Sequence, residues 1–141
     1  MKAVVQKRAR IARVRHVQHM QAAAAAQSAE GQLSLLENSA ARLTALRGSL
    51  ALVPGVSSGA ALGNSGELAM RLDDARIGLT DAIVSARSIA ADRAAQRLEA
   101  RRQKESAEKL GNRAATALVR LLEQRASAGR PRRAANIGEE E

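Results

Sequence analysis

The sequence predicts an all-α protein, a long two-helix antiparallel coiled-coil hairpin with a disordered C-terminal tail. Three features of the composition lead to this fold class. Of the 141 residues, 32 are Ala and 16 are Leu, there is no Phe, Trp or Tyr, and only two prolines interrupt the chain. Ala, Leu, Arg, Glu and Gln are good helix formers. Without aromatic side chains to fill a thick core, such helices are expected to meet along narrow, Ala-rich seams.

The predicted hairpin domain covers residues 1–125 and begins with a helix over residues 2–52. The second half of this helix carries an apolar stripe at helical spacing, with Leu36, Leu43 and Leu50 as candidate seam residues. In the run Ala22–Ala26 every residue is alanine, so no periodicity can be read there. The helix is expected to end near Leu52, because Val53 precedes Pro54 and the residue directly before a proline avoids the α conformation.

A loop is predicted over residues 53–66. This segment contains four of the ten glycines and Pro54, which is typical of a loop. Ser65 or Asn64 is expected to cap the following helix, with Glu67 favourably placed in its first turn.

The second helix is predicted over residues 67–125 and has the clearest periodicity. Reading alternately every three and four residues from Leu68 to Leu121 gives 13 apolar residues in 16 positions, a coiled-coil signature. The candidate seam residues of this helix are Leu68, Leu72, Leu79, Ile89, Leu110 and Leu121.

Neither helix can bury its stripe alone, so the two helices are expected to fold back on each other. With the turn near Gly59, the numbers of facing residues should add up to about 119, which places Ala22–Ala26 opposite Arg93–Arg97. The segment 126–141 is predicted to be a disordered tail. Because an Ala-rich seam buries little area, we expect marginal stability and a partner that completes the fold.

No catalytic, cofactor-binding or metal site is expected, and the chain is predicted not to be an enzyme. It has no cysteine, and His16 and His19 share a helical face without a carboxylate or thiolate to complete a metal site. The glycine-rich loop lacks the Lys-Ser/Thr pair of a phosphate-binding loop. No apolar run is long enough to cross a bilayer and no secretory signal is evident, so a cytoplasmic location is predicted.

The net charge of +9 favours an acidic partner. In the hairpin, the basic segments Lys2–Arg15 and Arg113–Arg133 should lie at the same end. Nucleic acid would also attract this charge, but the chain has no aromatic side chain to stack on a base. An acidic protein surface is therefore the expected partner, and specific nucleic-acid recognition is not expected.

Two motifs, in this order, resemble the flagellar FliJ family. The first helix contains Arg10-Ile11-Ala12-Arg13-Val14-Arg15, and the second contains Lys104-Glu105-Ser106-Ala107-Glu108-Lys109-Leu110. The stretches Leu33–Glu37 and Arg42–Arg47 add to the likeness, which covers about residues 8 to 125. The chain differs from many members of that family in having no aromatic residues on its surface, so no gate-binding residue is assigned.

The resemblance implies a coiled-coil stalk of the flagellar type III protein export apparatus, and so a role in flagellum assembly and motility. Its implied partners are the hexameric flagellar export ATPase, the cytoplasmic domain of the export gate and export chaperones. It also implies a location at the inner face of the cell membrane, at the flagellar base. The residues expected to face the ATPase ring are Arg8, Arg10, Arg13, Arg15, Arg113 and Arg120.

Two other functions remain compatible with the sequence. One is a general cytoplasmic coiled-coil adaptor or chaperone that shields secretion substrates. The other is a basic hairpin that associates with nucleic acid.

Overall fold

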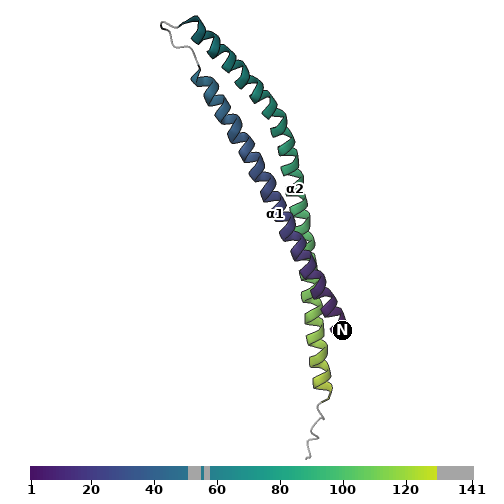
Figure 1. Ribbon diagram of the computed structural model, residues 1–141. Coiled ribbons are helices and arrows are strands. Elements are labelled where there is room, and N and C mark those ends of the chain that lie inside the picture. The colour runs from purple at the N-terminus through teal and green to yellow at the C-terminus, as the bar shows by residue number, and fades with distance from the viewer. Residues whose placement is uncertain (51–54, 56–57, 130–141) are drawn as a thin grey trace, which may run out of the picture. The chain divides into compact units, whose positions relative to one another are not determined.

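The computed structural model describes residues 1–50, 55 and 58–129. They form two long helices, α1 (Lys2–Ser49) and α2 (Gly59–Ala128), which account for nearly all described residues (Figure 1). No strand occurs in this part of the chain. The predicted all-α fold with two long helices packed against each other is confirmed.

The boundaries of both helices differ from the prediction. Helix α1 ends at Ser49. Leu50 follows in a turn, and its amide donates to the Arg47 carbonyl at 3.3 Å. Residues 51–54, which include the predicted helix end at Leu52, lie outside the described residues.

Helix α2 begins at Gly59, eight residues before the predicted start at 67. The cap is Ser58, not Ser65 or Asn64: the Ala61 amide donates to Ser58 Oγ at 3.2 Å, and the Leu62 amide donates to the Ser58 carbonyl at 3.1 Å. Ser65 instead donates its hydroxyl to the Ala61 carbonyl inside the helix. Glycines weaken a helix interior by only about 1 kcal/mol each relative to Ala, so a good cap and the Ala-Ala-Leu run can carry the helix through them.

At its other end, α2 continues to Ala128, so residues 126–128 of the predicted tail are helical. Ala126 and Ala128 are strong helix formers, and the helix closes where the Gly129 amide donates to the Arg125 carbonyl at 3.1 Å. The rest of the predicted tail, residues 130–141, lies outside the described residues.

The chain divides into two units, each built from a part of both helices. Unit 1 comprises residues 1–17, which include the start of α1, and the segment from residue 101 onward, and unit 2 comprises residues 18–100. In unit 2, Arg47 donates to Asp73 at 3.2 Å and Arg87 donates to Glu37 at 2.9 Å. In unit 1, Arg15 donates to Gln103 at 2.7 Å. Within each unit the two helices therefore pack against each other in opposite directions.

These pairs test the predicted register. Their residue numbers add up to 118 for Arg15 and Gln103, 120 for Arg47 and Asp73, and 124 for Glu37 and Arg87. The predicted sum of about 119 is thus correct to within a few residues in each unit.

The seam of α1 follows one coiled-coil repeat from Val5 to Leu50. Its less exposed positions alternate every three and four residues, and they include the predicted Leu36, Leu43 and Leu50. The repeat passes through the alanine run, where it selects Ala22 and Ala26. Ala26, Ala29 and Ala90, which are 1%, 7% and 8% exposed, are the three buried residues in the described chain, and all lie in unit 2.

A coiled-coil seam consists of two rows of residues, one for each apolar position of the seven-residue repeat. Only one of the two rows of α2 was predicted correctly. Leu72, Leu79 and Leu121 are half-buried as expected. Leu68, Ile89 and Leu110 instead remain 47%, 52% and 46% exposed. The residues that follow them, Ala69, Ala90 and Gly111, are the ones that face inward. Small side chains at these positions let two helix backbones approach closely, which Leu and Ile would prevent.

Candidate partner-docking surface

The six basic residues predicted to face a partner all belong to unit 1. Arg10, Arg13, Arg113 and Arg120 are exposed. None of these four forms an ion pair with another described residue. Their charges are available to a partner.

Arg8 and Arg15 occupy a different environment. Both are half-buried at seam positions of α1, and Arg15 donates to Gln103 across the seam. Their long side chains can cover apolar surface while the guanidinium reaches the edge of the seam. That Arg8 and Arg15 face the ATPase ring stays a prediction, and Arg15 in addition helps to join the two helices of unit 1.

The charge of the protein is concentrated in unit 1. Its described residues contain 13 Lys and Arg but only three Asp and Glu, namely Glu105, Glu108 and Glu123. Unit 2 is almost balanced, with seven basic and eight acidic residues. Unit 1 therefore carries a charge of about +10, which attracts and orients an acidic partner.

Two of the three acidic residues of unit 1 are already paired with basic residues on the same helix. Arg101 donates to Glu105 at 2.9 Å, and Lys104 lies 3.8 Å from Glu108. The hydrogen bond from Arg101, with further attraction from Lys109 and Lys104, lowers the pKa of Glu105, although partial desolvation acts in the opposite direction. Glu105 therefore stays ionised and reduces the local positive charge only in part.

Unit 1 also has a shallow apolar groove between its two helices. Ala12, Arg13, His16 and Val17 of α1 line it together with Glu108 of α2. His16 is exposed at this groove, whereas His19 is half-buried in unit 2, where its Nδ1 has no hydrogen-bond partner in the described structure. No group of three metal-binding side chains occurs among the described residues.

Three aspartates of α2 in unit 2 differ in their surroundings. Asp74 and Asp81 are exposed. Asp73 is half-buried and accepts the cross-helix hydrogen bond from Arg47. The aspartates thus divide between holding the hairpin together and facing outward.

Sequence reasoning missed a second apolar row on α2 in unit 2. Met70, Ile77 and Val84 recur every seven residues and are 69%, 66% and 61% exposed. Ala91 and Leu98 continue the row at the same interval. The seven-residue spacing is present in the sequence, but only one apolar repeat, from Leu68 to Leu121, was predicted on this helix.

Comparison with known protein families, with characterised proteins and with solved structures gave no match to this chain. No helix in the described part of the chain is long and apolar enough to span a membrane.

Proposed function

We propose that this chain is a non-enzymatic coiled-coil stalk of flagellar type III protein export, which docks unit 1 on an acidic surface of the hexameric export ATPase. The observation that carries the proposal is the concentration of charge, about +10 in unit 1 against near neutrality in unit 2. The FliJ-like motifs, which include Arg10, Arg13 and the Lys104–Leu110 stretch, fall in this same unit.

Electrostatic docking suits a protein that must bind with one unit and transmit force with the other. Exposed charges speed the encounter of the two proteins and orient it. Each exposed pair contributes less binding free energy than a buried contact, so the complex can dissociate. The balanced surface of unit 2 would then be left to the export gate and to chaperones, with the whole assembly at the inner face of the cell membrane at the flagellar base.

The test is binding of the purified chain to the purified export ATPase at increasing salt. We expect binding at low salt that weakens steeply as salt rises, because exposed charges are screened beyond about 10 Å at 0.1 M. An absence of binding at low salt would contradict the proposal. As an independent check, the gene is expected beside flagellar ATPase genes.

Paired variants locate the contact on the chain. Arg10→Gln with Arg13→Gln removes two exposed charges from unit 1, and we expect about tenfold weaker binding, which is about 1.4 kcal/mol. The matched control, Arg42→Gln with Arg76→Gln, removes two exposed charges from unit 2 and should leave binding unchanged. Equal losses from both pairs would indicate a non-specific effect of net charge.

The same charge supports a second candidate function, association with nucleic acid. The thirteen basic side chains among the described residues of unit 1 are enough for salt-sensitive binding to phosphates, although base stacking would be missing without aromatic residues. Retention on DNA of random sequence at physiological salt, together with failure to bind the ATPase, would favour this function.

A further inference from the structure

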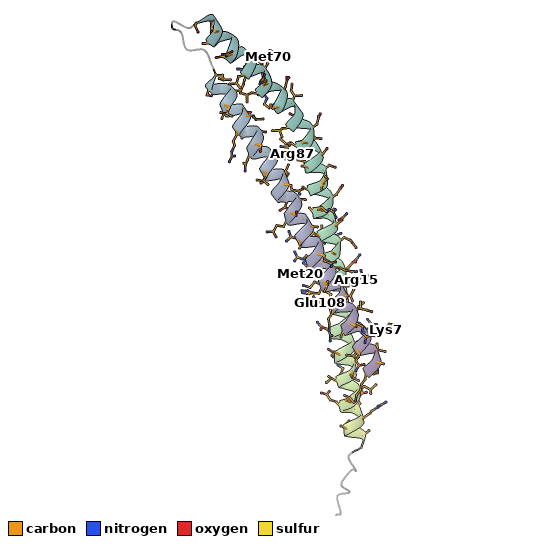
Figure 2. All side chains as sticks on the ribbon, in the orientation of Figure 1. Lys7, Arg15, Met20, Met70, Arg87 and Glu108 are labelled. Atoms are coloured by element: carbon orange, nitrogen blue, oxygen red, sulfur yellow. The ribbon has the colours of Figure 1, made fainter. Side chains whose placement is uncertain are left out.

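Unit 2 exposes an apolar row that nothing in the described chain covers. Met70, Ile77, Val84, Ala91 and Leu98 follow one another at intervals of seven residues on α2, about 10.5 Å apart along the helix axis. The side chains at seam positions, such as Leu72 and Leu79, point toward α1, so this row lies on a different side of α2. Figure 2 marks its first member, Met70. Below, the row is called the α2 stripe.

The flank of the α2 stripe is acidic. Glu67, Asp74 and Asp81 also recur every seven residues, one row away on the helix surface, and all three are exposed. Glu67 is paired with Arg71, whereas Asp74 and Asp81 have no ion pair with any described residue. The face therefore combines apolar contact area with two uncompensated negative charges.

The complementary face occurs in unit 1 of the same chain. Val4, Ile11, Val14 and Val17 of α1 are large apolar residues that are about half-exposed. Lys7, labelled in Figure 2, and Arg10 lie among them, are exposed and form no ion pair with a described residue. Below, these six residues are called the α1 face.

We propose that the α2 stripe of one molecule binds the α1 face of a second copy of this chain. The Met70–Val84 part of the α2 stripe matches the α1 face in length, since the first spans 14 residues and the second 13, about four helical turns each. They also match in charge, because Asp74 and Asp81 meet Lys7 and Arg10. Burial of the aliphatic side chains supplies the affinity, and the charges select the α1 face over a second α2 stripe, which would bring like charges together.

This contact is heterologous, since it joins different surfaces of the two copies. It does not depend on the proposed export function. If both proposals hold, self-association occupies Lys7 and Arg10, and it would compete with docking of unit 1 on an acidic partner.

The test is a charge exchange monitored by sedimentation equilibrium of the full chain. Variant one carries Asp74→Arg and Asp81→Arg, and variant two carries Lys7→Glu and Arg10→Glu. Alone, each variant should self-associate at least tenfold more weakly than the unchanged chain, because like charges then meet at the contact. An equimolar mixture of the two variants should recover association, since the reversed charges again attract.

Two controls separate this contact from other outcomes. Ile77→Gln with Val84→Gln should also weaken association by at least tenfold, and circular dichroism should show that its helix content is unchanged because both residues are exposed. If variant one weakens association but variant two does not, the partner surface is not the α1 face and the proposal is wrong. A monomeric unchanged chain at 100 µM would overturn it as well, and it would leave the ATPase-binding test unaffected.

Discussion

At the scale of single residues, the smallest side chains have the greatest structural importance. Ala26, Ala29 and Ala90 are the buried residues of the described chain, and each contributes one methyl group to the contact between the helices. At these three positions the contact has no room for a larger side chain, and it gains little from any one methyl group. Its stability therefore depends on close approach of the two backbones.

We expect Ala26→Leu to destabilise unit 2 by about 1–3 kcal/mol, because three additional carbon atoms must enter a site that is 1% exposed. Ala24→Leu is the matched control, since Ala24 is exposed on the same helix and the change should cost almost nothing. Urea unfolding of both variants, followed by circular dichroism, measures the difference. Equal stability of the two variants would mean that Ala26 is not at a tight contact.

A second prediction at this scale concerns Glu105. Its pKa is lowered chiefly by the hydrogen bond from Arg101, so folding favours the ionised carboxylate. The resulting stabilisation is present above the ordinary Glu pKa and is lost as the pH falls through the lowered value. Arg101→Gln should move the Glu105 pKa upward, as measured by NMR titration of the carboxyl carbon.

Arg102→Gln is the control for this titration, because Arg102 is exposed and is not a cause of the lowered pKa. An upward shift of similar size in both variants would assign the effect to general charge and not to the hydrogen bond.

At the scale of the helices, the glycines of α2 are tolerated without being required. A Cβ atom built on Gly78 would meet no other atom within 4 Å, and no described glycine has a positive φ. The cost of glycine in the helix is therefore the entropy of the unfolded chain and is not offset by a structural need.

Gly78→Ala should raise the free energy of unfolding by about 1 kcal/mol. The exposed neighbour Ala75 provides the reverse experiment, since Ala75→Gly should lower it by a similar amount. Thermal melts of both variants provide the check. Destabilisation by Gly78→Ala would show that this position needs a glycine.

The sequence allowed the helices and their register to be predicted, but not every detail of the seam. The row that contains Leu72, Leu79 and Leu121 was identified because large apolar residues recur in it. The second row was ambiguous, because two adjacent residues in the sequence can both fit a repeat that alternates between steps of three and four. Apolarity favoured Leu68, Ile89 and Leu110, whereas the packing selected the smaller Ala69, Ala90 and Gly111.

The candidate docking surface was predictable to a similar extent. The hairpin places both basic segments in one unit, as expected from their positions in the sequence. The half-buried seam positions of Arg8 and Arg15 were not predicted, because charge in a sequence does not reveal burial, whereas the repeat that includes Ala12 contains both residues. The helical start at Gly59 was missed because glycine content outweighed the capping signal of Ser58.

At the scale of the whole molecule, the two units differ in how well they are held together. Unit 2 contains all three buried residues and two cross-helix ion pairs. The seam of unit 1 includes the polar residues Arg8, Arg15, Gln103 and Lys104, which add little hydrophobic stabilisation. The unit proposed to bind a partner is therefore the less stable one, as is common for binding segments.

Hydrogen exchange should show this difference directly. We expect amides of residues 1–17 and 101–129 to exchange faster than those of residues 20–45 and 70–95, because local opening of unit 1 costs less. Binding of an acidic partner to unit 1 should slow its exchange selectively. Uniform protection along both helices in the free chain would contradict the prediction.

The narrow alanine seam has a calorimetric consequence. Heat capacity rises on unfolding in proportion to the apolar area that becomes exposed to water, and here that area is small for the length of the chain. The temperature profile of stability should accordingly be shallow, with a broad melting endotherm and little curvature. Such a protein would unfold gradually on warming, and its free energy of unfolding would depend on its bound partner more than on temperature.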